Sequence, residues 1–76
     1  MEEIKVGQIW QHFKGEKYKI IATAKDSEHL SDHIVYEALG DDPISKTWIR
    51  TKENFLETIN RGGKEIQRFT LIKNPD

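Results

Sequence analysis

The first half of the chain alternates apolar and polar residues with a period of two, which is the pattern of half-buried β-strands. A first strand is predicted over residues 7–13, with Trp10 and His12 on the same face. A glycine-containing stretch at residues 14–17 predicts a hairpin turn after it. The clearest strand follows over residues 18–25. The side chains predicted on its inward face are Tyr18, Ile20, Ala22 and Ala24.

Polar residues interrupt the alternation at residues 26–32, where side chains that hydrogen-bond their own backbone predict a loop or a single turn. The alternation returns over residues 33–39, which predicts a third strand. A cluster of turn-forming residues ends this strand at residues 40–43. A short fourth strand is expected over residues 46–50, around Trp48.

The period of the pattern then changes from that of a strand to that of a short helix. Thr51 is a suitable N-cap, because its hydroxyl can accept a hydrogen bond from the first helical turn. The pair Gly62 and Gly63 is interpreted as the end of this helix. A last strand is predicted over residues 66–72. The residues predicted to share the apolar face of the helix are Phe55, Leu56 and Ile59.

These elements predict a mainly β fold in a single domain, residues 1–76, because a chain of 76 residues cannot divide its apolar surface between two cores. About five short antiparallel strands favour a small bent sheet that closes into an SH3-like barrel. One short helix is expected before the last strand. The alternative is an α+β open sheet with the helix packed on it.

Composition narrows the class of protein further. The chain has no cysteine, which excludes disulfides and thiolate-bound zinc and favours a cytoplasmic location. No apolar run approaches the roughly 18 residues of a membrane span, and the acidic start is unlike a signal peptide, so we expect no membrane association. The net charge of −1 does not support nonspecific nucleic-acid binding.

Charge is unevenly distributed along the chain. The first and last thirds are basic, whereas residues 26–42 contain carboxylates and neither Lys nor Arg. If the two basic segments pair in space, the domain has one positive and one negative face. The alternative is that these are ordinary solvated surface charges.

Histidines are the first candidates for chemistry. His29 and His33 are four residues apart near carboxylates, a spacing that can hold a metal on a helix. Because we predict a loop there, the spacing loses that meaning, and we expect no metal and no cofactor. His12 precedes Lys14 in the first hairpin, where an imidazole can transfer protons or simply hydrogen-bond to a carboxylate such as Glu28. The chain contains no nucleophile elbow or phosphate-cradling glycine loop, so an enzyme is the less favoured class.

Arginines near aromatic residues are candidates for ligand binding. Arg50 follows Trp48 in the fourth strand, and its guanidinium fork suits a phosphate or a carboxylate. An exposed aromatic side chain beside Arg50 or Arg68 would suit stacking on a base, a nucleotide or an aromatic peptide side chain. The alternative is that both arginines pair with Glu28 or Glu37 across the sheet.

Residues spread over most of the chain form a sequence motif, in which each residue stands at a fixed place in the order. The set begins Gly7-x-x-Trp10-x-His12-Phe13-Lys14-Gly15-x-x-Tyr18-x-Ile20 and continues through Ala24-x-x-Ser27-Glu28, Val35-Tyr36, Trp48-Ile49-Arg50, Phe55 and Arg68-Phe69. It resembles the bacterial domain of unknown function 1653 family, and this resemblance implies a small, free-standing, β-rich bacterial protein. The matching positions that a core does not require are His12, Lys14, Ser27, Glu28, Trp48, Arg50 and Arg68.

Three positions depart from the pattern of that family. Asp26 stands where the family usually has a histidine before the serine, and Thr51 and Gln67 stand where it usually has prolines. A mechanism that needs this histidine is therefore not expected here.

We predict a noncatalytic module that binds an anionic or aromatic ligand, which is a peptide, a nucleotide or single-stranded nucleic acid. The alternative is a small enzyme or enzyme accessory in which His12 and Glu28 transfer protons. A third possibility is self-association through exposed edge strands, and we expect a monomer or weak homodimer with an unidentified ligand or protein partner. The candidate ligand-binding residues are Trp10, His12, Lys14, Glu28, Trp48, Arg50 and Arg68.

Overall fold

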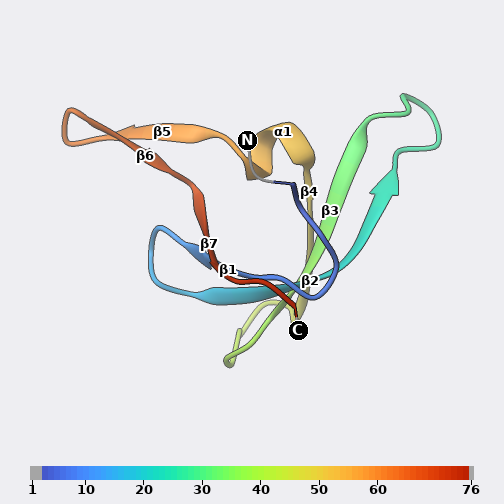
Figure 1. The fold of residues 1–76 in the computed structure, drawn as a ribbon, viewed down its shortest axis with the longest axis horizontal. Helices are drawn as coiled ribbons and strands as arrows, with labels where there is room; N and C mark the ends of the chain where they lie inside the picture. The colour runs from blue at the N-terminus through green and yellow to red at the C-terminus, as the bar shows by residue number, and fades with distance from the viewer. Residues whose placement is uncertain (1–2, 76) are drawn as a thin grey trace.

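Seven strands and one short helix make up the computed structural model, which describes residues 3–75 (Figure 1). In chain order the elements are β1 (Ile9–His12), β2 (Lys17–Lys25), β3 (Asp32–Ala38), β4 (Thr47–Thr51), α1 (Lys52–Phe55), β5 (Thr58–Arg61), β6 (Lys64–Gln67) and β7 (Phe69–Lys73). Among the described residues, no helix is long and apolar enough to span a bilayer.

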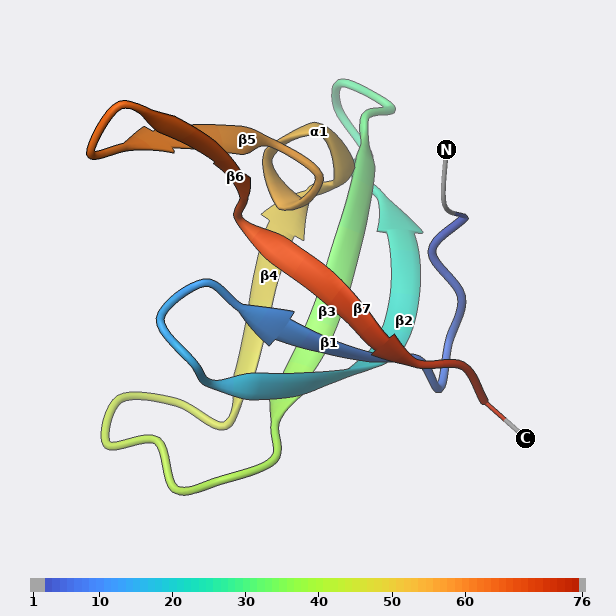
Figure 2. The ribbon, with the colours of Figure 1, turned by 60° about the vertical axis from the view of Figure 1, so that its left-hand side comes forward.

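Five of the strands form one antiparallel sheet in the order β4-β3-β2-β1-β7, and β5 pairs only with β6. The edge strands β4 and β7 do not pair with each other, so residues 3–75 form no closed barrel. The mainly β, antiparallel class is confirmed, but the predicted SH3-like barrel is wrong. The physical reason is the β5–β6 hairpin, which takes up the chain between the two edge strands and projects from the sheet (Figures 1 and 2).

The helix is shorter than predicted and does not directly precede the last strand. Thr51 caps it as expected, because its Oγ1 accepts a hydrogen bond from the Asn54 backbone N–H at 3.1 Å. Gly62 and Gly63 do not end a helix but form the turn of the β5–β6 hairpin. Their φ angles of 60° and 83° are both positive, the backbone shape that a two-residue hairpin turn with right-handed strand twist requires.

Aromatic side chains fill the core between α1 and the sheet. The Phe55 and Phe69 rings stack with centroids 4.1 Å apart and planes at 6°, and Trp10 meets Phe55 edge-on at 5.3 Å. The indole of Trp10 also donates a hydrogen bond to Oε1 of Gln8 at 3.0 Å, so its polar atom is satisfied inside the core. Because α1 contributes Phe55, the single helical turn holds β3 and β4 against β7. The buried hydrophobic residues are Ile4, Trp10, Tyr18, Ile20, Ile34, Tyr36, Ala38, Phe55 and Phe69.

A register shift between Ile20 and Ala22 changes which side chains of β2 face inward. Tyr18 and Ile20 are buried, as predicted, but Ala22 is only half-buried and Ala24 is exposed. The inward prediction for these two alanines is therefore wrong, because a bulge adds one residue and breaks the period of two.

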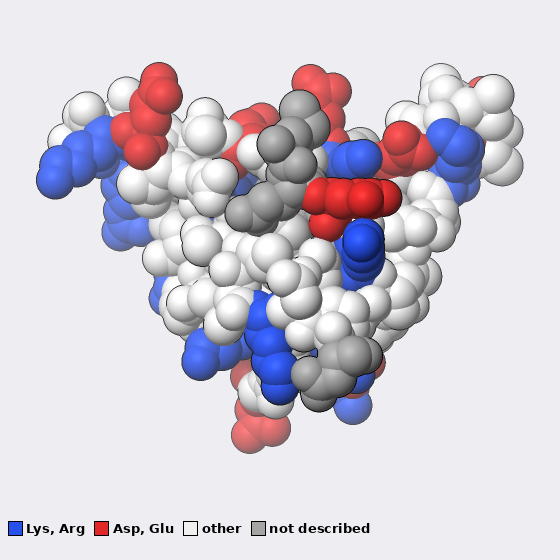
Figure 3. All heavy atoms as spheres, viewed as in Figure 1, with Lys and Arg blue, Asp and Glu red and all other residues white. Residues whose placement is uncertain are grey.

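The basic first and last thirds of the chain meet in the fold. β1 pairs antiparallel with β7, and the backbone N–H of Phe13 donates to the Arg68 carbonyl at 2.9 Å. Lys14 and Arg61, from the two basic segments, both lie near the Phe13 ring. Figure 3 shows lysine and arginine side chains along the edge that runs from the β5–β6 hairpin toward the β1–β2 turn.

Candidate functional site

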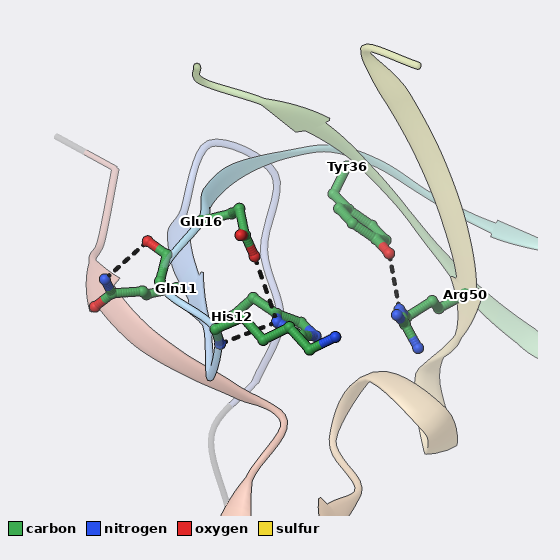
Figure 4. Close-up of polar contacts among 7 residues, drawn as sticks. Gln11, His12, Glu16, Tyr36 and Arg50 are labelled. Atoms are coloured by element: carbon green, nitrogen blue, oxygen red, sulfur yellow. Dashed lines mark hydrogen bonds and ion pairs between the residues drawn. The ribbon is translucent and has the colours of Figure 1, made fainter. Parts of the chain in front are cut away.

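Three nitrogen-rich side chains meet at the edge of the aromatic core. His12 comes from β1, Arg50 from β4, and Arg68 from the link between β6 and β7; we call these three residues the basic rim. The His12 ring centroid lies 5.0 Å from that of Phe69, and Cζ of Arg50 lies 5.5 Å from the same ring. Figure 4 shows His12 and Arg50 extending toward the same space from opposite sides.

Two neutral acceptors orient the Arg50 guanidinium. Nε donates to the Tyr36 hydroxyl at 2.8 Å (Figure 4), and Nη1 donates to Oδ1 of Asn54 at 2.6 Å. Tyr36 is buried in β3, and Asn54 is held in α1 by the Thr51 cap. The orientation is therefore built by three separate elements, and neither bond neutralises the charge or uses Nη2.

Arg68 is held between the hairpin and the core. Its Nη2 donates to Oε1 of Glu57 at 2.8 Å, and its backbone N–H donates to the Glu57 carbonyl at 2.9 Å. The Arg68 side chain is 19% exposed, whereas that of Glu57 is 48% exposed. The Nε atom of Arg68 is buried and has no hydrogen-bond partner among the described residues. Buried N–H groups are nearly always paired, so this unpaired donor makes Arg68 a candidate binding residue.

His12 is a neutral hydrogen-bonding group in this setting. Burial lowers its pKa from 6.5, the nearby Glu16 carboxylate partly offsets that effect, and Arg50, Arg68 and Lys14 lower the pKa further. Its Nδ1 accepts the backbone N–H of Lys14 at 3.2 Å, which assigns the proton of the neutral ring to Nε2. At neutral pH the rim therefore presents two charged guanidiniums and one imidazole N–H.

Further cations surround Phe13 at the outer side of the rim. Nζ of Lys14 lies 5.8 Å from the Phe13 ring centroid, and Cζ of Arg61 lies 5.3 Å from it. Arg61 comes from β5, so the projecting hairpin reaches the β1–β2 turn through this contact. The sequence patterns did not identify Arg61, because it was placed at the end of a helix and not in a hairpin.

Two of the predicted binding residues lie outside the rim. Trp10 is 2% exposed in the core, so it has no free surface for a ligand. Glu28 is exposed in the loop between β2 and β3, and its backbone N–H donates to Oδ1 of Asp26. The nine-residue strand β2 separates this loop from His12, a span of roughly 25 Å at the rise of a β-strand. The structure therefore does not bring His12 and Glu28 together.

The remaining predicted residues lie close to the rim or flank it. Trp48 lies in β4, where it is half-buried and pairs with Tyr36 of β3. Its indole donates to the Ser45 carbonyl at 3.1 Å. Lys14 is exposed in the β1–β2 turn.

The alternative pairing of Arg50 and Arg68 with Glu28 or Glu37 is wrong. Salt bridges instead join Arg68 to Glu57 and Lys46 to Glu37.

The histidines of the β2–β3 loop form local contacts. Nδ1 of His29 lies 2.9 Å from Oδ2 of Asp26, and Nδ1 of His33 lies 3.1 Å from the Ser31 carbonyl. Within residues 3–75, no group of three histidine or carboxylate side chains is arranged to hold a metal ion.

A surface hollow of about 380 Å³ lies away from the rim, at the ends of β2 and β3. Its wall includes Lys25 and Asp32, whose Nζ and Oδ1 atoms are 2.6 Å apart in an ion pair. These two charges neutralise each other, and His33 and Lys52 also line the hollow. The basic rim contains the Arg50 guanidinium, which two neutral acceptors hold in place, and it is the stronger candidate site.

Comparison with known proteins identifies the family. The model of the family described as "Protein of unknown function (DUF1653)" matches residues 8–71, so the chain belongs to that family and the resemblance is confirmed. The crystal structure of a DUF1653 protein from Bordetella bronchiseptica has the same fold, with a TM-score of 0.80. The two sequences are 23% identical, over 100% of this chain and 99% of that chain. No curated protein matches the sequence.

Proposed function

We propose that this DUF1653 domain is a noncatalytic binding module whose basic rim holds an anionic ligand. The observation that carries the proposal is the guanidinium of Arg50, which is half-buried, fixed by Tyr36 and Asn54, and not paired with any carboxylate of residues 3–75. Side-chain entropy normally opposes such an arrangement, because a free arginine keeps its rotamers in water. A fixed, unneutralised guanidinium is ready to bind an anion with little further loss of entropy.

The second support is the convergence of other donors on the same place. Arg68 contributes a buried Nε that lacks a partner among the described residues, and His12 contributes its Nε2 proton. Trp48 and Phe13 lie at the margins, so a ligand with a flat apolar part would find an aromatic surface beside the anion site. Peptides, nucleotides and single-stranded nucleic acid all offer such a combination. We place the module in the reducing cytoplasm, in keeping with a cysteine-free sequence.

Proton transfer between His12 and Glu28 receives no such support, because β2 separates the two residues. Self-association through the edge strand β4 is also weaker. The hydroxyl of Ser45 bonds both the backbone N–H and the carbonyl of Thr47, which occupies part of the free edge. We therefore propose that the module acts as a monomer or a weak homodimer.

The test is a titration of ¹⁵N-labelled protein with a panel of anions, followed by amide and side-chain shifts. The panel contains inorganic phosphate, acetate, an acidic peptide and a single-stranded oligonucleotide. Saturable shifts should centre on His12, Arg50 and Arg68. Arg50→Gln should remove them, whereas the control Lys46→Gln, which deletes a charge from an exposed pair with Glu37, should keep them. Equal responses in both variants would refute the proposal.

A further inference from the structure

The basic rim has more unused N–H groups than a carboxylate can accept. A guanidinium carries five N–H donors, and the described bonds use two on Arg50 and one on Arg68. The Nε2 proton of His12 adds another donor. A carboxylate has two oxygens with about four acceptor positions, whereas a phosphate monoester has three strongly accepting terminal oxygens. The donor inventory thus matches a phosphoryl group better.

The charge of the rim also matches a dianion. Both acceptors of Arg50 are neutral, so its full positive charge is available to a ligand. Arg68 shares its charge with Glu57, but that carboxylate is 48% exposed and weakened by solvent. Lys14 and Arg61 add positive charge from the outer side. A phosphate monoester, with a charge of about −1.5 to −2 at neutral pH, gains more from this field than a singly charged carboxylate does.

The position of the orphaned Nε of Arg68 supports the same ligand class. Nε and Nη2 form one edge of the guanidinium, and on that edge the Glu57 carboxylate accepts a bond from Nη2 alone and leaves Nε without a partner among the described residues. A tetrahedral phosphoryl group that displaces the exposed Glu57 carboxylate could accept from both N–H groups of this edge, with a third oxygen left for Arg50.

We infer that the ligand of the basic rim is a phosphate monoester, bound by Arg50 and Arg68 with His12 as an additional donor. This inference rests on the proposed function and specifies the chemistry of its ligand. A phosphate monoester occurs on small metabolites, on nucleotides and on phosphorylated side chains, and the rim recognises the group that all of these share.

The experiment compares phenyl phosphate with benzoate, which has the same ring and a carboxylate in place of the phosphoryl group. Calorimetry and NMR on the full chain should give at least about tenfold tighter binding of phenyl phosphate, which corresponds to about 1.4 kcal/mol. Phenyl phosphate should also raise the pKa of His12, because a dianion nearby favours the charged imidazole. Adenosine monophosphate and a phosphoserine peptide, titrated next, distinguish a nucleotide source from a peptide source.

Two variants test the assignment of residues. Arg68→Gln should reduce the preference for phenyl phosphate over benzoate to less than about threefold. Glu57→Gln removes the competing carboxylate from an exposed position and should tighten phenyl phosphate binding by about twofold to fivefold. This second variant keeps the test decisive if Arg68→Gln fails to fold.

The outcomes separate the inference from the proposed function. Benzoate binding at the rim as tightly as phenyl phosphate would overturn the phosphate assignment and leave an anion-binding module. If neither compound shifts His12, Arg50 or Arg68, both the inference and the proposed function fail. A preference for phenyl phosphate that survives unchanged in Arg68→Gln and Glu57→Gln would also overturn the assignment.

Discussion

The hydrogen bond between Arg50 and Tyr36 links the binding rim to the core, and its removal has a predictable sign. Arg50→Met keeps the apolar stem of the side chain but leaves the buried Tyr36 hydroxyl without its donor at 2.8 Å. An unsatisfied buried hydroxyl costs about 1–3 kcal/mol. Tyr36→Phe leaves the half-buried Nε of Arg50 without its acceptor, which water can partly replace, so we expect a cost of about 1 kcal/mol.

The double variant Arg50→Met with Tyr36→Phe removes both polar partners together. Replacing both partners of a buried hydrogen bond by apolar groups of similar shape changes the free energy of unfolding little. The free energy of unfolding should therefore fall by less than the sum of the single losses, with a coupling energy of about 1.5–3 kcal/mol for a hydrogen bond to a charged group.

The assay is urea unfolding of the four proteins in the cycle, followed by the combined fluorescence of Trp10 and Trp48. The m-value should be the same for all four, so that differences in midpoint report stability. Additivity within about 0.5 kcal/mol would refute the argument, because it would mean that the Arg50–Tyr36 bond does not contribute to folding. In the same series, Tyr36→Phe should weaken phenyl phosphate binding by about threefold, since it keeps both charges but releases the guanidinium.

Three other predictions concern the fold and the pH response. Gln8→Leu should lower the thermal midpoint, because it leaves the buried Trp10 indole N–H without its acceptor; the expected loss is about 1–3 kcal/mol by calorimetry. Gly63→Ala should cost about 1–2 kcal/mol by urea unfolding, because the φ of Gly63 is 83°, while the control Gly40→Ala, at a position without positive φ, should be near neutral. The lowered pKa of His12 means that the unfolded chain binds its proton more tightly, so stability should fall as pH drops below 6.5. Unfolding at about pH 7 and about pH 5 should show a smaller loss for His12→Gln, and an equal loss would contradict the low pKa.

The alternation of residues predicted where the strands of the main sheet lie. It did not predict that the sheet stays open. The pattern at Tyr18 and Ile20 located β2 and its inward face correctly. It failed at Ala22 and Ala24, because a bulge is decided by pairing with β3 and leaves no mark on the period within one strand. An open sheet results in part from such long-range register, which local patterns do not contain.

The helix after β4 was predicted to be too long, because the residues near it are compatible with two local structures. A helix N-cap and three apolar residues at helical spacing predicted a longer helix, and Gly62-Gly63 was compatible with its end. The same glycine pair is also a strong hairpin turn signal, and the structure adopts that conformation. Residues 58–67 then form strands, in which Ile59 pairs with Ile66 and gains a cross-strand apolar contact that a single helical turn could not supply.

Of the residues predicted to bind a ligand, three form the basic rim, whereas Trp10 and Glu28 lie elsewhere for two different reasons. His12 and Arg50 converge because β1 and β4 border the same aromatic core, and Arg68 directly precedes Phe69 of that core. Trp10 failed because a small domain uses its largest side chain to fill that core. The prediction for Glu28 was wrong because a sequence motif gives the order of residues along the chain and not their distance in space. The length of β2 separates the loop that contains Glu28 from His12.

The aromatic core holds the charged side chains of the basic rim in place. Arg50 lies against the Phe69 ring and donates to Tyr36, so its charge is held where solvent screening is reduced. Burial and the nearby guanidiniums of Arg50 and Arg68 lower the pKa of His12, which limits the repulsion among these groups in the free protein. An anion would reverse this balance, because it attracts both arginines and favours the protonated imidazole. Ligand binding should therefore be accompanied by proton uptake at His12 and by added stability, both of which follow from the same convergence of charges.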